Sequence, residues 1–258
     1  METTRRRFIQ ICGFSLASLG LGALAKSVSA QTKILPGPKA FKGKRWAMVV
    51  DPAKCLDGCT DCIQACNQAH NVPHIPNHEE EIKWIWTEDY EHAFTGQEYE
   101  FVDEKIKDQP FIVLCNHCAK PPCVRVCPTK ATFKRASDGI VMMDWHRCIG
   151  CRFCMAACPY GSRSFNWADP RVYMPEPSNP DFPTRAKGVV EKCTFCAERL
   201  DRGLVPACVE ACAKKGREAL VFGDLEDPQS KVRQLLRQHY AIRRKPELGT
   251  NPGIYYIV

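Results

Sequence analysis

The sequence predicts an α+β protein in which one small module is inserted into another. Sixteen of the 17 cysteines fall into four groups of four, and each group ends in a C-x3-C unit. A short apolar run typical of a β-strand precedes each group. The second and third groups lie close together in the sequence, between the first and the fourth. These observations indicate two nested cysteine-rich modules with short strands and helices, joined by loop-rich inserts.

The composition restricts the class of protein before any motif is considered. The chain has 258 residues, of which 45% are hydrophobic and 25% charged, as in folded soluble proteins. These values argue against a disordered chain and against a protein with several membrane spans. A chain of this length does not need many disulfides for stability, so its cysteines predict either metal sites or a disulfide framework.

Residues 1–30 predict an export signal. Arg5, Arg6 and Arg7 precede a charge-free run of 15 residues, from 11 to 25, which is shorter than the roughly 20 residues that span a bilayer. Small residues at 28–30 suit a cleavage site. Residues 4–10 resemble a twin-arginine signal, which directs export of proteins already folded, often with their cofactor. We therefore expect a location on the outer, periplasmic face of the cytoplasmic membrane; an ordinary amphiphilic start or an uncleaved anchor is the alternative.

Cysteine spacing distinguishes metal sites from disulfides. Cys12 lies in the apolar run of the signal, and the other cysteines form four groups. The groups are Cys55, Cys59, Cys62 and Cys66; Cys115, Cys118, Cys123 and Cys127; Cys148, Cys151, Cys154 and Cys158; and Cys193, Cys196, Cys208 and Cys212.

The third group has the spacing C-x2-C-x2-C-x3-C-P, which is typical of bacterial ferredoxins. Three thiolates two residues apart can hold three corners of one [4Fe–4S] cube, and the fourth cysteine points to a different cube. Zinc sites pair C-x2-C units instead, and disulfide frameworks have no reason to repeat this clustering. The other groups widen one gap each but keep the final C-x3-C. Sixteen ligands at four per cube predict four [4Fe–4S] clusters.

Distances along the chain predict how the groups pair. Only 20 residues separate Cys127 from Cys148, so groups two and three form one two-cluster module, and groups one and four form the other. The last cysteine of each group is then exchanged with its partner group. The predicted sites are A (Cys55, Cys59, Cys62, Cys212), B (Cys193, Cys196, Cys208, Cys66), C (Cys115, Cys118, Cys123, Cys158) and D (Cys148, Cys151, Cys154, Cys127). The residues alone leave open the other pairing, of group one with two and three with four.

This pairing divides the chain into six parts. They are the signal at 1–30, an outer bacterial-ferredoxin-type 2[4Fe-4S] module at 41–66 plus 189–223, an insert at 67–110, an inner module of the same type at 111–160, an insert at 161–188, and a C-terminal helix and tail at 224–258. Strands are expected at 46–50, 111–114, 140–143, 188–190 and 219–222.

A helix is predicted over residues 231–244, with Asp227 as its cap and Pro228 in its first turn. Its expected apolar face, formed by Val232, Leu235, Leu236 and Tyr240, would pack onto the modules. The aromatic residues of the first insert (Trp84, Trp86, Tyr90, Phe94, Tyr99 and Phe101) form either a core of that insert or a docking face. His70, His74 and His78 recur every four residues, but Pro73 and Pro76 interrupt that pattern, so we expect surface or packing roles.

No catalytic residue is expected. The sequence contains no nucleophile–base arrangement, phosphate loop or nucleotide fingerprint. Cysteine ligates every predicted iron, which leaves none open for a substrate. The formal charge of +7 does not indicate a nucleic-acid partner, because thiolate-ligated clusters add negative charge. The pattern therefore predicts an electron-transfer subunit without its own substrate site. A secreted disulfide-rich or zinc-binding module is the alternative from another class.

From about residue 46 to 222, the four-group pattern resembles the four-cluster iron–sulfur subunits of membrane-associated respiratory complexes. These include the electron-transfer subunits of molybdopterin oxidoreductases and of nitrite-reductase-linked (NrfC-like) complexes. The resemblance implies that groups one and four pair, as do two and three. Asn67 and Ala213 stand where the family pattern has proline after the last cysteine of a group, which leaves ligation intact but makes the local backbone an open question.

Three features resemble one branch of this family, the iron–sulfur subunit of the sulfite-reduction-linked DsrMKJOP complex. They are the widened first gap within residues 51–62, the twin-arginine signal, and the C-terminal segment at 251–258. This resemblance implies electron exchange between a quinone pool and a thiol/disulfide carrier. It also implies an integral-membrane NrfD-like quinone-interacting subunit, a multihaem cytochrome c and further subunits as partners. The alternative is a molybdopterin oxidoreductase or NrfC-like complex.

Overall fold

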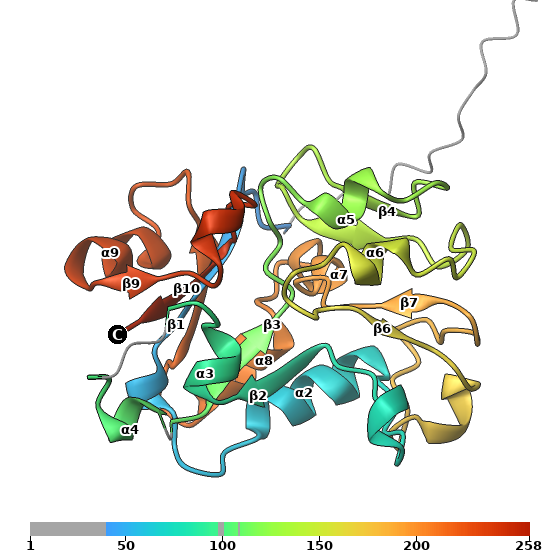
Figure 1. Cartoon of the computed structure of the whole chain (residues 1–258), viewed down its shortest axis with the longest axis horizontal. Coiled ribbons are helices and arrows are strands. Elements are labelled where there is room, and N and C mark those ends of the chain that lie inside the picture. The colour runs from blue at the N-terminus through green and yellow to red at the C-terminus, as the bar shows by residue number, and fades with distance from the viewer. Residues whose placement is uncertain (1–39, 98–100, 108) are drawn as a thin grey trace, which may run out of the picture. The chain divides into compact units, whose positions relative to one another are not determined.

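A four-stranded sheet joins segments that are far apart in the sequence (Figure 1). In this computed structural model, which describes residues 40–97, 101–107 and 109–258, the strand order is β8-β1-β10-β9. Strand β1 (Trp46–Val50) pairs antiparallel with β8 (Leu220–Asp224) and parallel with β10 (Ile254–Ile257). Strand β9 (Ala241–Ile242) completes the edge beside β10. The expected export signal lies outside the described residues.

Three antiparallel two-stranded ladders carry the remaining strands. Strand β2 (Ile85–Glu88) pairs with β3 (Phe111–Leu114), β4 (Thr132–Lys134) with β5 (Val141–Met143), and β6 (Ser164–Phe165) with β7 (Val190–Glu191). The strands predicted at 46–50 and 111–114 have the predicted bounds, and those at 140–143, 188–190 and 219–222 are displaced by one or two residues. Each of these runs is apolar and largely buried, which explains why sequence alone located them.

The helices are short, and several of them carry the cysteines. Helix α2 (Asp61–His70) and helix α8 (Ala207–Lys214) lie against each other and are the two longest helices that carry cysteines. Shorter helices are α3 (Tyr90–Ala93), α4 (Glu104–Lys107), α5 (Pro122–Arg125), α6 (Phe153–Ala156) and α7 (Ala197–Leu200). Four 3-10 turns occupy Pro52–Lys54, His78–Glu80, Pro170–Tyr173 and Pro246–Leu248. Short helices and small sheets together make the α+β fold that the sequence predicts.

The aromatic residues of the first insert belong to the main core. Phe94 is fully buried, and its ring lies 5.0 Å from Phe111 of β3 and 5.0 Å from Tyr256 of β10, measured between centroids. Trp84 and Tyr90 are also buried in this cluster, so these side chains do not form a core of the insert alone. Phe101 is 83% exposed, and Tyr99 lies outside the described residues.

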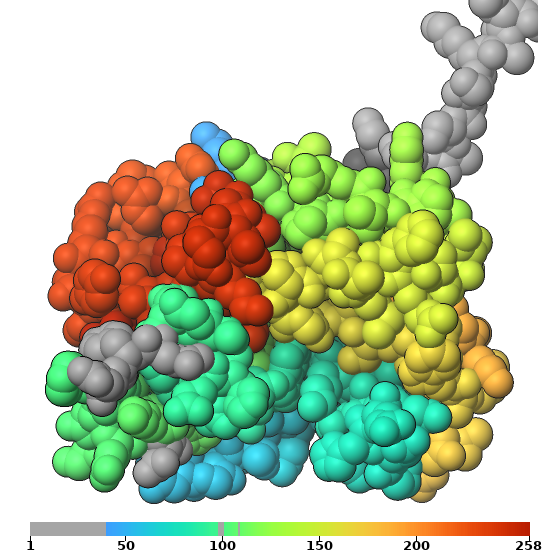
Figure 2. Space-filling view, viewed as in Figure 1, coloured from blue at the N-terminus to red at the C-terminus, as the bar shows by residue number. Residues whose placement is uncertain are grey.

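The C-terminal residues pack against this insert as well. Arg244 Nε donates to the Ala93 carbonyl at 2.6 Å, and Gln97 Nε2 donates to the Arg243 carbonyl at 3.0 Å. Figure 2 shows the C-terminal segment (red) directly beside the segment around α3 (green). The chain end is therefore an integral part of the described fold.

The prediction of a helix over 231–244 is partly wrong. Helix α9 (Lys231–Gln238) ends six residues earlier, because Ala241 and Ile242 pair with Ile257 and Tyr256 in the sheet. The cap is Ser230, whose hydroxyl accepts a hydrogen bond from the Arg233 amide at 3.3 Å, whereas Asp227 accepts from the Gln229 amide in the preceding turn.

Because helix α9 ends at Gln238, only part of the predicted apolar face packs against the sheet. Val232 is fully buried, and Leu235 and Leu236 pack with Ala47 and Val49 of β1, as expected for the apolar face. Tyr240 lies beyond the helix and is 77% exposed, so its predicted place on that face is wrong. No helix in the described part of the chain combines the length and the apolar character needed to cross a bilayer.

Candidate metal centres

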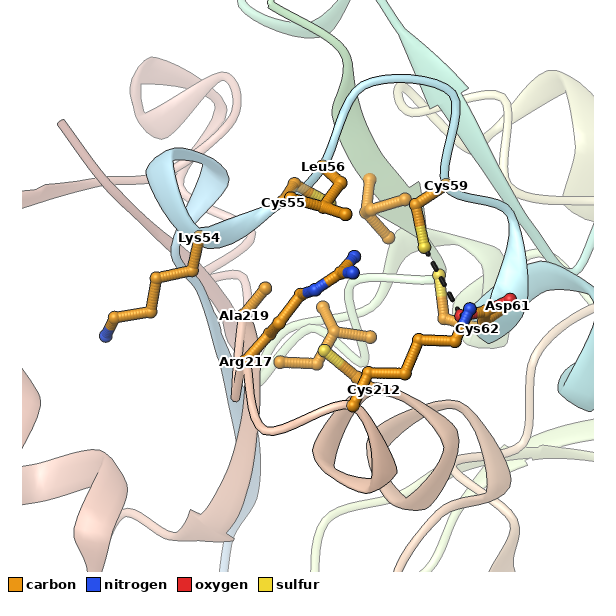
Figure 3. A pocket seen from close by; sticks show the side chains of 12 residues that line it. Lys54, Cys55, Leu56, Cys59, Asp61, Cys62, Cys212, Arg217 and Ala219 are labelled. Carbon is orange, nitrogen blue, oxygen red and sulfur yellow. Dashed lines mark hydrogen bonds and ion pairs between the residues drawn. The ribbon is translucent and has the colours of Figure 1, made fainter.

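Site A is a pocket lined by Cys55, Cys59, Cys62 and Cys212 (Figure 3). The first two lie on the loop before α2, where Gly58 adopts a left-handed φ of 68°, and Cys212 comes from α8. Burial, together with the nearby Cys55, Cys212 and Cys59 thiols, raises the pKa of Cys62 to about 12. Four thiolates that converge in one pocket repel one another, and a bound cation would offset that repulsion.

Site B is more deeply buried and joins α2 to the fourth group. Burial raises the pKa of Cys66 well above its ordinary value, and the Cys193, Cys196 and Cys208 thiols raise it further. Two backbone amides point at sulfur atoms here. The Phe195 N–H donates to Cys193 Sγ at 3.4 Å, and the Ala207 N–H donates to Cys196 Sγ at 3.4 Å. Such donors favour the thiolate form that a metal needs.

Site C is a second pocket, lined by Cys115, Cys118, Cys123 and Cys158. Burial raises the pKa of Cys118 to about 12, and the Cys115 thiol contributes to the increase. The C-terminal segment holds the loop that carries Cys118. The Ala119 amide donates to the Asn251 carbonyl at 2.9 Å, and the Gly253 amide donates to the Asn116 carbonyl at 2.7 Å. The C-terminal segment thus holds this loop in place through backbone hydrogen bonds.

Site D lies nearer the surface. Cys148 and Cys154 thiols are within Coulombic range of each other, and Cys127 and Cys148 pack against the small hydrophobic cluster that contains Cys154. Cys127, Cys148 and Cys151 are half-buried. Burial acts to raise the pKa of Cys127, but hydrogen bonds to its sulfur outweigh this effect and lower the pKa below its ordinary value. The donors are the Thr132, Ala131 and Thr129 amides and the Thr129 hydroxyl. These hydrogen bonds therefore make the thiolate of Cys127 easier to form than that of an ordinary cysteine.

Each site adjoins the next. Helices α2 and α8 both carry one cysteine of site A and one of site B, namely Cys62 with Cys66 and Cys212 with Cys208. The Cys193 thiol of site B is within Coulombic range of Cys115 in site C. The Cys154 thiol of site D is within Coulombic range of Cys123 in site C. Site A therefore adjoins site B, site B adjoins site C, and site C adjoins site D.

The donor set fits iron–sulfur clusters. The sixteen cysteines among the described residues are all free thiols, and none of them forms a disulfide. Most are buried, so a charged thiolate without a compensating metal would be unfavourable. Soft sulfur ligands in groups of four are the donors that such clusters use.

Of the histidines near the cysteines, His70 and His117 are buried and His146 is exposed. His70 is buried, with Nδ1 at 2.9 Å from the Cys66 carbonyl and 3.6 Å from Cys66 Sγ, and Nε2 at 3.0 Å from Glu198 Oε1. Its ring stacks on Trp84 at 4.7 Å. His117 accepts a hydrogen bond from the Val141 amide through Nδ1, while His146 is exposed. His70, Cys196 and Glu198 have donor atoms within 4.8 Å of one another, but Cys196 already belongs to site B.

Two buried cations beside the cysteines were not found by sequence reasoning. They are Arg163, which is 5% exposed, and Lys192, which is fully buried. Each follows or precedes a cysteine group closely, but lone basic residues in a sequence usually lie at the surface. The sequence offered one indication of their role, which is that both lie near a cysteine group. The burial of their side chains is evident only from the fold.

Comparisons with known proteins agree with this chemistry. Residues 109–174 and 176–224 match the family described as the 4Fe-4S dicluster domain. The chain is 39% identical over 273 residues to the Hdr-like menaquinol oxidoreductase iron-sulfur subunit 1 of Archaeoglobus fulgidus, covering 98% of this chain and 97% of that protein. It is 39% identical over 240 residues to the menaquinone reductase iron-sulfur cluster-binding subunit of Nitratidesulfovibrio vulgaris, covering 85% and 90%. It is 35% identical over 258 residues to the protein NrfC of Escherichia coli, covering 100% and 96%. The sixteen clustered cysteines and the dicluster domain fit four [4Fe–4S] clusters.

Proposed function

Because the chain belongs to the family of ferredoxin-type iron–sulfur subunits of oxidoreductase complexes, we propose that it relays single electrons between a membrane quinone-interacting subunit and another redox subunit of one complex. The observation that carries this proposal is the adjacency of sites A, B, C and D, each with four cysteines. Bound [4Fe–4S] clusters supply reversible one-electron chemistry. The residues of the chain bind the iron through thiolates, exclude water from the buried sites and set the local charge.

The proposed ligand sets exchange the last cysteine of each group. Site A takes Cys55, Cys59, Cys62 and Cys212; site B takes Cys193, Cys196, Cys208 and Cys66; site C takes Cys115, Cys118, Cys123 and Cys158; and site D takes Cys148, Cys151, Cys154 and Cys127. The shared pockets at sites A and C and the thiol contacts at site B support these sets.

The same exchange supports one module nested in another. The proposed outer module, 41–66 plus 189–223, is joined by the pairing of β1 with β8 and by the contact of α2 with α8. The proposed inner module, 111–160, contains the β4–β5 ladder between its two cysteine groups. The exported, periplasm-facing location also belongs to this proposal, with membrane association through the partner subunits.

Two complexes are candidates for this subunit. The similarity to NrfC and to a menaquinone reductase subunit supports a reductase complex, either NrfC-like or with a molybdopterin subunit. The second candidate is DsrO, the iron–sulfur subunit of DsrMKJOP, supported by residues 51–62, the signal at 1–30 and the C-terminal segment at 251–258. The proposed partner is an integral-membrane NrfD-like quinone-interacting subunit, and the DsrMKJOP candidate adds a multihaem cytochrome c.

Identification of the copurifying subunits tests these assignments. The chain is isolated from gently solubilised native membranes without oxygen, and its partners are identified by mass spectrometry. A large molybdopterin subunit or a nitrite reductase beside an NrfD-like protein supports the reductase assignment. A b-haem protein, a c-type cytochrome and a disulfide-reductase-like iron–sulfur subunit support DsrMKJOP. Recovery of the chain without any redox or membrane partner contradicts both assignments.

A further inference from the structure

Arg163 and Lys192 flank one end of the β6–β7 ladder, since Arg163 immediately precedes β6 and Lys192 immediately follows β7. The ladder pairs Ser164 with Glu191 and Phe165 with Val190, so both residues adjoin its Ser164–Glu191 pair. Both side chains are buried, at 5% and 0% exposure. The charge of Arg163 acts on Lys192, and like charges close together repel, at a cost that burial away from water increases.

Arg163 connects cysteines of two different sites. Its Nη2 atom donates to Cys123 Sγ at 3.0 Å and to Thr132 Oγ1 at 2.8 Å. The guanidinium also forms a hydrogen bond with the Cys154 thiol. Cys123 belongs to site C and Cys154 to site D, so one fixed positive charge lies at the junction of these sites.

Lys192 lies near cysteines of sites B and C. Its Nζ atom donates to the Cys193 carbonyl at 2.6 Å and to the Val141 carbonyl. Burial lowers the pKa of this ammonium, and the nearby Cys115, Cys193 and Cys123 thiols oppose that shift. Cys115 and Cys123 belong to site C and Cys193 to site B, so Lys192 lies at the junction of sites B and C.

The partners of these cations are sulfur atoms, carbonyls and a hydroxyl. Among the residues that the structure describes, no carboxylate lies within ion-pair distance of Arg163 or Lys192. A buried charge without a counter-ion is strongly unfavourable. The negative charge that balances this pair is therefore the charge of the thiolate-ligated sites themselves.

We propose that the positive charges of Arg163 and Lys192 raise the reduction potential of the cluster at site C. Arg163 also raises the potential at site D, and Lys192 the potential at site B. Reduction adds one negative charge to a cluster, and a fixed cation in a poorly hydrated environment stabilises that added charge. Site C receives the field of both cations, and sites B and D each receive one. The proposal rests on the ligand sets of the proposed function.

Redox titration of charge-removing variants, followed by electron paramagnetic resonance, tests this inference. The full chain, purified with its complex without oxygen, is compared as wild type, Arg163→Gln and Lys192→Gln, with iron quantified in each. One cluster signal is expected to shift to lower potential in both variants, by about tenfold in its reduction equilibrium, or about 59 mV for a one-electron couple. A second signal shifts only in Arg163→Gln, a third only in Lys192→Gln, and the fourth in neither.

Matched controls separate charge from structure. Arg125 and Lys120 are exposed and lie two residues from Cys123 and Cys118, so solvent screens the effect of Arg125→Gln and Lys120→Gln. The variants Arg163→Lys and Lys192→Arg keep the charge and are expected to restore most of the potential. If one glutamine variant fails to assemble its clusters, the other still has its own predicted pair of shifted signals.

The outcomes distinguish this inference from the proposed function. A wild-type chain with four clusters whose potentials do not respond to either substitution overturns the role of the two cations and leaves the relay intact. Equal shifts of all four signals, or shifts as large in the exposed controls, also overturn it. A wild-type chain without four clusters refutes the proposed function itself.

Discussion

Cys62 and Cys212 line the same pocket, although both inner cysteine groups lie between them in the sequence. Cys62 comes from α2 and Cys212 from α8, and these helices pack against each other. Residues four apart share one face of a helix, so α2 presents Cys62 to site A and Cys66 to site B. Helix α8 does the same with Cys212 and Cys208. The C-x3-C spacing thus allows one helix to contribute a cysteine to each of two sites.

Paired serine substitutions test the exchange of ligands. Cys212→Ser is expected to damage the cluster held by Cys59, and Cys66→Ser the cluster held by Cys196. The double variant Cys59→Ser/Cys212→Ser should lose no more iron than its worse single variant, because both ligands serve one cluster. The losses in Cys196→Ser/Cys212→Ser should add. The iron content per chain and the Mössbauer spectra of anaerobically purified protein measure the cluster loss in each variant. Additive losses in Cys59→Ser/Cys212→Ser, with no added loss in Cys196→Ser/Cys212→Ser, would contradict the exchange.

The C-terminal segment is expected to stabilise site C through Thr250. Its hydroxyl shares a hydrogen bond of 2.5 Å with the Tyr160 hydroxyl, and both residues are buried. Thr250→Val leaves the Tyr160 hydroxyl unpaired and should cost about 1–3 kcal/mol of unfolding free energy. Denaturant titration by circular dichroism without oxygen measures this, and Thr95→Val at an exposed position is the control. Equal midpoints for Thr250→Val and wild type would contradict the role of the chain end.

The buried ion pair between Arg185 and Glu191 should be sensitive to removal of either partner. Arg185 Nη2 and Glu191 Oε2 are 2.8 Å apart, and Trp84 Nε1 also donates to Glu191 at 3.0 Å. Glu191→Ala is expected to cost about 3–5 kcal/mol because it leaves a buried guanidinium without its counter-ion.

A double variant separates the pair from its parts. Arg185→Met/Glu191→Met should be less destabilised than the sum of the two single variants, because it leaves no unpaired charge. The exposed pair of Arg171 and Asp169 is the control, and Asp169→Asn should leave the denaturation midpoint unchanged. Simple additivity at Arg185 and Glu191 would show that the two side chains are not coupled.

The buried phenol of Tyr256 should make the unfolding free energy decrease at high pH. Burial raises the pKa of this phenol well above its ordinary value of about 10. The unfolded chain therefore loses the proton first, so the unfolding free energy declines as pH rises above about 10, by at most about 1.4 kcal/mol per pH unit from this group. Tyr256→Phe should flatten the decline, whereas Tyr240→Phe at the exposed position should not. Denaturant midpoints between pH 9 and 11 measure this; parallel curves for Tyr256→Phe and wild type would exclude the effect.

Local sequence patterns predicted the strands that precede the cysteine groups. The run at 46–50 and the run at 111–114 are continuously apolar, and both strands are buried with the predicted bounds. Burial on both faces removes the need for alternation, so such runs are recognisable without knowledge of their partners.

The features that sequence missed depend on distant parts of the chain. The amphipathic pattern after residue 231 favours a helix to 244, but backbone pairing of Ala241 with Ile257 ends it early. The parallel pairing of Ile254 with Met48 likewise depends on tertiary packing. Arg163 and Lys192 are ordinary basic residues in the sequence, and only the β6–β7 register and their burial identify them.

Quantification of iron and acid-labile sulfide in the full chain, purified without oxygen, tests the central claim most directly. Four [4Fe–4S] clusters predict about sixteen iron atoms and about sixteen sulfides per chain. Protein with zinc or disulfides and no iron, or with iron for only two clusters, would contradict the account.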